Sequence, residues 1–495
     1  MFKKILIANR GEITVRVIRA CKELGIISAA IYSDADKTSL HTSLADESYH
    51  IGAAPASESY LNKNKIIELA KKIKADAIHP GYGFFSENSD FIKSVEDSGI
   101  AFIGPSSKSV SMMGNKTEAR TLMGRHKVPI VPGATQPIKN MDEGTALASK
   151  IGYPVLLKAV AGGGGKGMRK IISEDEFSSS FEAVKREALK AFANDDVYIE
   201  KYIDNPRHIE VQVFGDKFGN YVHLFERECS IQRRHQKIIE EAPSSFVDPE
   251  TREKITTAAI SSAKACGYFN AGTVEFLMDS NKKFYFLEMN TRIQVEHPVT
   301  EMITGKDLVK EQILVASGKP LSFSQDDIKI NNHSIEARIY AEDPQNNFLP
   351  STGNISNYYE PSGLGVRVDS GIRHGSVVSV YYDPLLSKLV CWDSNRDSAI
   401  KKILRALDEY NIAGVTNNVS FLSKILSSEK FIKGDFDINF LEREKLLFNP
   451  TKSVSDNSDM QRASTILAGL LKRGTIVTQE KSGAASNKWI EQNYE

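Results

Sequence analysis

Glu288-Met-Asn-Thr-Arg-Ile-Gln-Val-Glu296 follows two short segments of alternating apolar residues, which are separated by the turn-forming residues Ser280-Asn-Lys-Lys283. Two alternating segments joined by a short polar loop are typical of an antiparallel β-hairpin. A four-residue loop would pair Asp279 with Phe284, and the same register places Glu275 directly opposite Glu288. The sequence therefore predicts a hairpin that brings two glutamates face to face.

The predicted pair of glutamates indicates a metal site. Two carboxylates about 5 Å apart at an effective dielectric constant of about 20 repel each other by roughly 3 kcal/mol, and a divalent cation between them removes this cost. Asn290 adds an amide oxygen on the same face, because side chains two positions apart share a face of a strand. Hard oxygen ligands suit Mg²⁺ or Mn²⁺ that also holds nucleotide phosphates. A salt-bridged surface hairpin is the alternative, but Arg292, Gln294 and Glu296 continue the same parity with polar groups.

Composition excludes several classes of protein. A chain of 495 residues has room for two to four domains. Its 63 Lys and Arg residues balance 63 Asp and Glu residues, which argues against a protein that coats nucleic acid or an anionic membrane. The four cysteines lie far apart, without zinc-site spacing. No apolar run reaches the length of a membrane span, and Ile5-Leu-Ile-Ala8 is too short for a signal peptide, so we expect a cytoplasmic protein.

The first part of the chain alternates strands and helices. Apolar strands are predicted at Ile5–Ala8 and Ile26–Tyr32, on either side of an amphipathic helix over Gly11–Leu24. This order is typical of a doubly wound, parallel α/β layer. The turn after the first strand reads Asn9-Arg-Gly-Glu12 and lacks the glycines of a dinucleotide site, so nicotinamide binding is disfavoured.

After about residue 116 the pattern changes to charged strands and repeated hairpins with helices on one side, which predicts an α+β arrangement. Further strands are predicted at Ile151–Val160, Gly365–Asp369 and Ser376–Tyr381, and a helix at Arg396–Tyr410. Beyond about residue 448 the chain is rich in Ser, Asn and Lys. That composition favours a disordered tail with one short docking helix.

A glycine-rich run, Gly162-Gly-Gly-Gly-Lys-Gly167, comes shortly after Lys158 at the end of an apolar strand. The exposed amides of such a loop can wrap phosphate oxygens, and Lys158 could project toward the same phosphates. The run is not a Walker A motif, because no Gly-Lys-Ser/Thr follows. A flexible linker and a surface lysine are the alternatives, but the glycine run and Lys158 are close in sequence, which favours a phosphate site.

The stretch Cys229-Ser-Ile-Gln-Arg-Arg-His-Gln-Lys237 packs three cations between Arg233 and Lys237. A solvated charged loop is one interpretation. The other is an anion site beside a nucleotide, because charge-assisted donors hold phosphate or bicarbonate well. Arg292 can grip a planar, carboxylate-like anion with two hydrogen bonds, and Glu296, close to it in sequence, is a candidate general base.

Together these motifs resemble the biotin carboxylase component of biotin-dependent carboxylases, a member of the ATP-grasp group. The resemblance runs from about residue 1 to 446, and Arg292-Ile-Gln-Val-Glu-His297 separates this family from other ATP-grasp ligases. The matching motifs are Lys4-Ile-Leu-Ile-Ala-Asn-Arg-Gly-Glu-Ile13, His79-Pro-Gly-Tyr-Gly83, Gly162–Met168, Glu200-Lys-Tyr202, Glu228–Pro243 and Glu288–Pro298.

The resemblance implies an ATP-grasp fold that combines α/β and α+β parts. An N-terminal doubly wound domain would occupy residues 1–115. A central ATP-grasp domain would occupy residues 116–330, with a mobile lid at about 131–203, and a C-terminal mixed β/α domain would occupy residues 331–446. Residues 447–495 would form an extension that is partly disordered or docks another subunit.

The resemblance also implies roles for individual residues. The ATP site would be lined by Lys116, Lys158, Gly163, Gly164, Gly165, Glu200, Lys201, Ile203, His208, Gln232, His235, Glu275 and Glu288. The metal ligands would be Glu275, Glu288 and Asn290. Bicarbonate and biotin would contact Lys237, Arg292, Gln294, Val295, Arg338 and Tyr82. The catalytic residues would be Lys237, Arg292, Glu296 and Arg338, with Glu296 deprotonating bicarbonate and Arg338 stabilising the biotin enolate.

The expected cofactors are ATP, two Mg²⁺ or Mn²⁺ ions, and biotin. No Met-Lys-Met sequence for biotin attachment occurs in the chain, so we expect biotin on a separate carrier protein and a separate carboxyltransferase. A homodimer is expected, with no nucleic-acid or membrane partner. The predicted reaction is carboxylation of biotin through carboxyphosphate in an acetyl- or propionyl-CoA carboxylase. The alternatives are a two-subunit pyruvate carboxylase, a non-biotin ATP-grasp ligase and an inactive nucleotide-binding scaffold.

Overall fold

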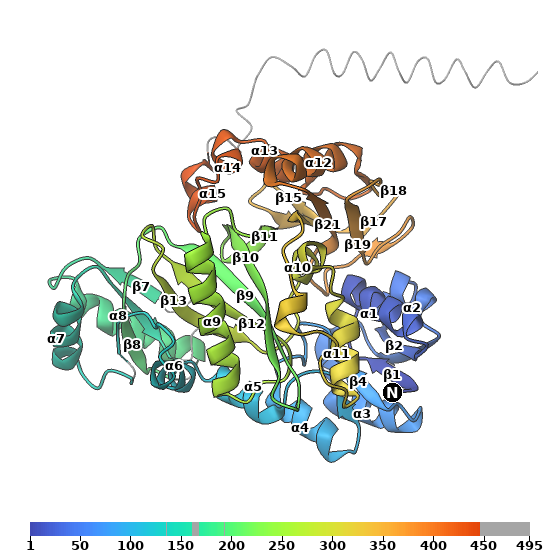
Figure 1. Ribbon diagram of the computed structural model, residues 1–495, viewed down its shortest axis with the longest axis horizontal. Helices are drawn as coiled ribbons and strands as arrows, with labels where there is room; N and C mark the ends of the chain where they lie inside the picture. Colours follow the sequence, from blue (N-terminus) through green and yellow to red (C-terminus); the bar gives the residue numbers. More distant parts are fainter. Residues whose placement is uncertain (135, 161–167, 193, 446–495) are drawn as a thin grey trace, which may run out of the picture. The chain divides into compact units, whose positions relative to one another are not determined.

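The computed structural model describes residues 1–445 except 135, 161–167 and 193 (Figure 1). The predicted phosphate loop and the predicted extension at residues 447–495 therefore lie outside the described residues. Within the described part, the strands form one sheet of five strands, one of eight, one of three and three of two.

The N-terminal sheet has the strand order β3-β2-β1-β4-β5, and every neighbouring pair is parallel. This confirms the predicted doubly wound layer. The order reverses between β1 and β4, where ligand crevices open in sheets of this kind. The strands are β1 (Lys4–Ile7), β2 (Ile27–Ser33), β3 (Glu47–Gly52), β4 (Ala77–His79) and β5 (Ala101–Phe102).

Alternate residues of β1 enter two different cores. Ile5 and Ile7 pack with Val17 of α1, whereas Leu6 packs with Ile66 of α3 and Phe91 of α4. Both faces of the sheet are therefore covered, which is why its strands read as continuous apolar runs. The helices of this part are α1 (Gly11–Glu23), α2 (Leu40–Leu44), α3 (Lys63–Lys72), α4 (Ser89–Asp97) and α5 (Ser107–Gly114), with 3₁₀ turns η1 (Asp34–Asp36) and η2 (Ala56–Glu58).

The largest sheet runs in the order β13-β12-β9-β10-β11-β14-β21-β19, with every neighbouring pair antiparallel. It continues across residue 330, where one predicted domain ends, because β14 pairs with β11. Two parts of the sequence thus build one continuous surface. The strands are β9 (Arg207–Gly215), β10 (Tyr221–Arg233), β11 (Gln236–Ala242), β12 (Asn270–Met278), β13 (Phe284–Asn290), β14 (His333–Tyr340), β19 (Val366–Ser370) and β21 (Leu385–Asp393).

Helices cover both faces of this sheet. Helix α9 (Pro249–Ala265) buries Ile255 and Ala259 against Val211 of β9. Helix α11 (Leu308–Ala316) belongs to the cluster that also contains Phe214 of β9 and the α1 side of the N-terminal sheet, and it lies between these two layers in Figure 1. Helix α10 (His297–Thr304) precedes it and packs on β10, β11 and β14.

The three-stranded sheet β7-β6-β8 occupies the region predicted as a lid. Its apolar face packs against α7 and α8. The strand predicted at Ile151–Val160 is wrong at its start, because Ile151 is the last residue of a helix that ends at Gly152 with a φ of 84°. The elements are α6 (Lys116–Arg125), α7 (Met141–Ile151), β6 (Val155–Ala159), β7 (Met168–Ile171), α8 (Phe177–Phe192) and β8 (Val197–Lys201).

Short strands follow β14, and the sequence predicts two of them. The strand predicted at Ser376–Tyr381 reduces to Val377–Val378, because it pairs only with two residues of β17. The predicted helix is α12 (Arg396–Glu409), and the strand predicted at Gly365–Asp369 begins one residue later. The remaining elements are η3 (Gln325–Asp327), β15 (Glu342–Asp343), β16 (Leu349–Pro350), β17 (Gly353–Asn354), β18 (Asn357–Tyr359), β20 (Val377–Val378), β22 (Asn411–Ala413), α13 (Val419–Leu426), α14 (Glu429–Ile432) and α15 (Phe440–Arg443).

Among the helices of the described residues, none combines the length and the apolar character needed to cross a bilayer.

Candidate active site

The hairpin of β12 and β13 places Glu275 opposite Glu288, as predicted. The predicted route to that pairing is wrong, however. Met278, not Asp279, pairs with Phe284, and the register shifts by one residue between Phe276 and Glu275. Without this β-bulge, the register set by the turn would place the residue before Glu288 opposite Glu275. The bulge thus aims the second carboxylate at the first, as bulges beside functional sites often do.

The turn differs from the prediction because of a side-chain interaction. The Asp279 carboxylate accepts hydrogen bonds from the backbone amides of Asn281 and Lys283, each at 2.9 Å. Asp279 thereby belongs to the loop rather than to the ladder. Aspartate competes with strand pairing in this way because its short side chain reaches nearby amides.

Most of the predicted site residues line one cavity of about 620 Å³. Strands of the eight-stranded sheet supply one wall, and β6 and β8 of the three-stranded sheet supply another. The predicted residues that line it are Lys116, Lys158, Glu200, His208, Gln232, His235, Lys237, Glu275, Glu288, Asn290, Arg292, Gln294, Val295, Glu296 and Arg338.

Three predicted residues do not line this cavity. The Lys201 ammonium donates to the carbonyls of Gly152 and Tyr153 at 2.8 and 3.1 Å, and so fastens β8 to the end of α7. Ile203 lies just beyond β8. Tyr82 lies at the switch point of the N-terminal sheet, where its carbonyl accepts from Asn9 at 2.8 Å. The predicted glycines Gly163, Gly164 and Gly165 fall outside the described residues.

At one end of the cavity, Glu200 holds two cations. Lys158 contacts its carboxylate at 2.5 Å, and Arg120 forms a second, short ion pair with it. Both cations and the carboxylate are buried or nearly so. Gln232 lies on the neighbouring wall, where its amide contacts His208 at 2.8 Å. Lysine and amide donors around a pocket between two sheets suit a nucleotide.

The predicted metal ligands fit a divalent cation in part. Although 42% of the Glu288 side chain is exposed, loss of hydration in the cavity wall and the repulsion of Glu275 raise its pKa, which is the effect expected of opposed carboxylates without a cation. Lys116 lies 4.0 Å from Glu288. The side chain of Asn290 presents its nitrogen to Glu275 at 2.7 Å and its oxygen to Arg292 at 3.3 Å, so a half-turn of the amide is needed before its oxygen can serve as a ligand. The fit to a divalent cation therefore depends on the carboxylates of Glu275 and Glu288.

Lys237 lies at the centre of the site. Its ammonium contacts Glu210 at 2.5 Å, Glu275 at 2.8 Å and Glu296 at 2.7 Å. Burial alone would lower the pKa of Lys237, but the three carboxylates outweigh burial and raise it well above its usual value. Lys237 is therefore a fixed positive charge. It also fills the space between Glu210 and Glu275, whose oxygens otherwise lie close enough, with His208, to hold a metal.

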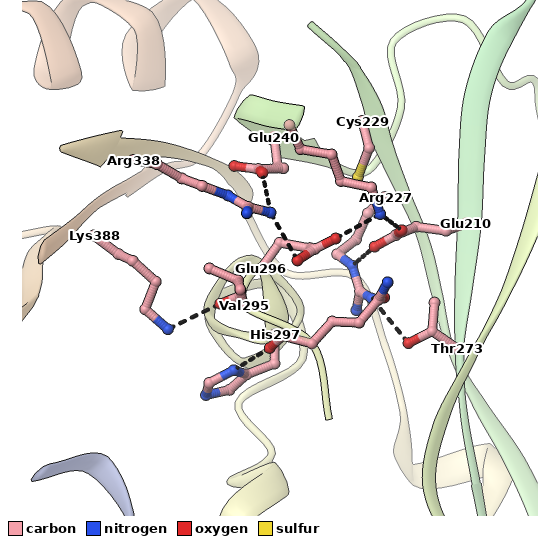
Figure 2. Close-up of polar contacts among 12 residues, drawn as sticks. Glu210, Arg227, Cys229, Glu240, Thr273, Val295, Glu296, His297, Arg338 and Lys388 are labelled. Atoms are coloured by element: carbon pink, nitrogen blue, oxygen red, sulfur yellow. Dashed lines mark hydrogen bonds and ion pairs between the residues drawn. The ribbon is translucent and has the colours of Figure 1, made fainter. Parts of the chain in front are cut away.

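Glu296 lies between two cations just before α10. One oxygen accepts from Lys237 at 2.7 Å, and the other accepts from Arg338 at 3.0 Å (Figure 2). Burial would raise the pKa of Glu296, but Lys237, Arg338 and Arg227 outweigh burial and hold it well below its usual range. The carboxylate is thus ionised and able to accept a proton. An anion bound beside Lys237 would compete for the same cations and raise the pKa of Glu296 toward the range of an effective base.

Two further predicted residues are positioned by partners that the sequence analysis did not identify. Glu87, from the loop before α4, contacts Arg292 at 3.0 Å. Lys388 of β21 donates to the carbonyl of Val295 at 2.8 Å and lies 3.2 Å from Glu12 of α1. Lys388 is fully buried, and its ammonium is 6.0 Å from the centre of the Tyr82 ring. It therefore links the loop that carries Glu296 to the N-terminal layer.

Arg227 is the most important residue that sequence reasoning missed. This fully buried guanidinium uses all five of its N–H groups, which is the full donor capacity of arginine. Figure 2 shows it beside Glu210 and Thr273. Its acceptors are Glu210 at 2.5 Å, Gln212 at 2.8 Å, Thr300 at 3.0 Å, Thr273 at 3.1 Å and Gln294 at 2.7 Å. Arg227 thereby fixes both Gln294 and the carboxylate that holds Lys237. The sequence holds one signal for this role, an arginine in the middle of the strand Tyr221–Arg233. A charge that is buried within a sheet needs a buried partner of opposite charge.

Family comparisons agree with this site. Residues 1–110 match the family "Biotin carboxylase, N-terminal domain", and residues 336–443 match "Biotin carboxylase C-terminal domain". Residues 115–324 match "Carbamoyl-phosphate synthase L chain, ATP binding domain". Biotin carboxylase 1 of Bacillus subtilis is 52% identical over 443 residues, which are 89% of this chain and 98% of that protein. The chain belongs to the biotin carboxylase family. Membership makes it an ATP-dependent ligase and confirms the three-part architecture predicted from the sequence.

Other relatives of the biotin carboxylase family are longer than this chain. The mitochondrial propionyl-CoA carboxylase alpha chain of Mus musculus is 54% identical over 442 residues, which are 89% of this chain but 61% of that protein. A crystal structure of the 2-oxoglutarate carboxylase biotin carboxylase domain dimer of Hydrogenobacter thermophilus, in complex with MgADP, ADP and bicarbonate, is 49% identical. It has a TM-score of 0.86 and covers 91% of this chain and 100% of that one.

Proposed function

We propose that this chain catalyses ATP- and bicarbonate-dependent carboxylation of biotin carried on a separate carrier protein. The observation that supports it most is the content of the cavity. One end offers Lys158, Glu200 and Gln232 for a nucleotide, and the other gathers Glu296, Lys237 and Arg338 around a space for small anions. The proposal therefore places a phosphoryl donor and a bicarbonate acceptor in one cavity.

In the proposed reaction, Lys237, Arg292 and Gln294 hold bicarbonate, and Glu296 takes its proton. A bicarbonate oxygen then attacks the γ-phosphorus of ATP, the bond to the β–γ bridging oxygen breaks, and ADP and carboxyphosphate form. Carboxyphosphate breaks down to CO₂ and phosphate, and the phosphate accepts the proton of biotin N1′. The resulting enolate, stabilised by Arg338, attacks CO₂. Fixed cations aimed at developing charge supply most of such a rate enhancement.

A divalent cation held by Glu275 and Glu288, with Asn290 after an amide rotation, would neutralise phosphate charge when bound. The residues of the chain perform the rest of the work. Lys116 and Lys158 would bind phosphate oxygens, and the sheet β7-β6-β8 would exclude water from an intermediate that hydrolyses readily.

The acceptor of the carboxyl group in this proposal is an acyl-CoA, because an acyl-CoA carboxylase alpha chain is 54% identical. A 2-oxo acid such as pyruvate is the alternative, since the neighbour from Hydrogenobacter comes from a 2-oxoglutarate carboxylase. The proposed partners are a biotin carrier, a carboxyltransferase and a second copy of this chain, without nucleic acid or membrane. A cytoplasmic location is proposed as well, supported by the four cysteines, which are free and buried.

Measurement of ADP release tests the proposed function. Purified protein with ATP, Mg²⁺ and bicarbonate should release ADP faster when free biotin is added, and ¹⁴C from bicarbonate should appear in carboxybiotin. ADP release that ignores biotin but responds to ammonia or an amino acid would instead indicate another ATP-grasp ligase. Nucleotide binding without any turnover would indicate a scaffold. Co-purification of a biotinylated carrier with a transferase would then identify the acceptor class.

Glu288→Gln tests the metal site. This change removes one of two opposed carboxylates, and we expect the Mg²⁺ concentration for half-maximal ADP release to rise by about tenfold or more. Glu409→Gln is a matched control, because the exposed fractions of the Glu409 and Glu288 side chains are 40% and 42% and Glu409 lies far from the cavity on α12. An unchanged Mg²⁺ requirement in Glu288→Gln would exclude Glu288 as a ligand.

A further inference from the structure

Arg338 has a second anionic partner besides Glu296. Its Nη2 atom lies 2.6 Å from Glu240 of β11 and 3.0 Å from Glu296 (Figure 2). Glu240 is fully buried, and Arg338 is 7% exposed. Strands β11 and β14 are paired, so the pairing of their backbones holds the side chains of Glu240 and Arg338 close together.

A third carboxyl group lies beside this pair. Glu336 is directly opposite Glu240 in the ladder of β11 and β14, and it is also fully buried. The oxygens of Glu336 and of Glu240 alike have no hydrogen-bond partner of good geometry among the described residues. Glu240 has its ion pair with Arg338 at 2.6 Å, whereas Glu336 has no ion pair among the described residues. Two buried carboxyl groups at opposite positions cannot both stay charged next to a single guanidinium without a large cost.

The protein environment distinguishes the two carboxyl groups. The positive charges that act on Glu336 are Lys388 and Arg338, while Glu240 and Glu296 repel it, and burial raises its pKa well above the usual value. Burial also raises the pKa of Glu240, to about 7, but Arg338 and Lys237 oppose the rise. Glu336 therefore keeps its proton to a higher pH than Glu240, and Glu240, which forms the ion pair with Arg338, is the member of the pair that ionises first.

We propose that Glu240 is a positioning residue for Arg338, and that Glu336 stays neutral so that Glu240 can remain ionised. This inference rests on the proposed function. In that reaction Glu296 becomes neutral when it takes the proton of bicarbonate, and its attraction for Arg338 weakens at that moment. Glu240 takes no part in the proton transfer, so it still holds the guanidinium where the biotin enolate has to form.

The geometry leaves Arg338 with a donor for that task. Arg338 lines the cavity, and Glu240 and Glu296 both contact the same atom of its guanidinium, Nη2. A guanidinium held from one side by Glu240 can present its other N–H groups to a substrate oxygen. Without Glu240, the position of the guanidinium would depend on its contact with Glu296 alone.

The test compares Glu240→Gln with Glu336→Gln, the same change at opposite positions of one strand pair. ADP release is measured with and without free biotin, because a general folding defect lowers both rates together. We expect the ratio of the two rates to fall about tenfold or more in Glu240→Gln, together with a higher KM for biotin. We expect Glu336→Gln to keep the ratio within about twofold, since glutamine mimics a neutral acid.

Glu240→Asp provides a second measurement if Glu240→Gln does not fold. It keeps the charge but withdraws it from Arg338, so the ratio should fall again. A normal ratio in a folded Glu240 variant, or equal losses in Glu240→Gln and Glu336→Gln, would overturn the inference. If the unaltered protein shows no biotin-stimulated release, the proposed function fails first, and the inference fails with it.

Discussion

Glu296→Gln is expected to reduce biotin-dependent ADP release by a factor of about 10² to 10⁴, the usual contribution of a general base. Glutamine has nearly the same size, and its one amide oxygen can still accept a hydrogen bond from either Lys237 or Arg338, which contact the two carboxylate oxygens at 2.7 and 3.0 Å. It cannot accept a proton. Nucleotide affinity should stay within about twofold, because the predicted ATP contacts lie on other residues. Steady-state kinetics and ATP titration measure the two effects separately.

Glu311→Gln is the control for removing a buried carboxylate. Glu311 of α11 is 3% exposed, and it accepts hydrogen bonds from Ser322 at 2.8 and 2.6 Å, so glutamine can keep at least one of them. Its ADP release should match that of the unaltered protein. Turnover of Glu296→Gln at the control level would remove Glu296 from the mechanism, and equal losses in both variants would point to stability instead.

Arg227→Met is expected to lower the free energy of unfolding by about 3–5 kcal/mol, because removing one partner of a buried ion pair leaves an uncompensated charge. The stranded charge would be Glu210, which is fully buried and contacts Arg227 at 2.5 Å. The variant should also lose catalytic activity, since Gln294 and Lys237 depend on the same network. Urea-induced unfolding measures the first effect and ADP release the second.

Two further variants make this prediction specific. Arg227→Lys keeps the charge but supplies three donors in place of five, so it should lose less stability than the methionine variant. Arg405→Met breaks an exposed ion pair with Glu409, and such pairs contribute about 0–1 kcal/mol. A loss for Arg227→Met as small as that of Arg405→Met would show that the buried network does not stabilise the fold.

The hairpin shows how far local pattern carries a prediction. Alternation correctly placed Glu275 opposite Glu288, although the assumed turn was one residue too short. The structure differs from the prediction in two ways that compensate each other. Asp279 belongs to the loop, which shifts the register by one residue, and a bulge in β13 shifts it back before Glu288. The alternation itself is local, whereas the bulge depends on the loop and on the neighbouring strand.

The site shows where local pattern fails. The family resemblance implies that both Glu200 and Lys201 lie in the ATP site, but adjacent residues of a strand face opposite sides. The Lys201 side chain fastens β8 to the end of α7, so its contact with ATP stays a prediction. The sequence also predicts no role for Arg227 or Glu240, because each is only a charged residue within a strand. Their partners Gln294 and Arg338 lie far along the sequence.

The sequence by itself determined the class of fold and the hairpin with its opposed carboxylates, because strand and helix periodicities are properties of neighbouring residues. The resemblance of its motifs to a known family indicated most of the residues that line the cavity. Only the tertiary structure decided which buried charges neutralise each other. Arg227 reaches Gln294 across 67 positions of the chain, and Glu240 meets Arg338 because β11 pairs with β14. Such contacts follow from the order of strands in the sheet, which long-range packing fixes and local sequence does not encode.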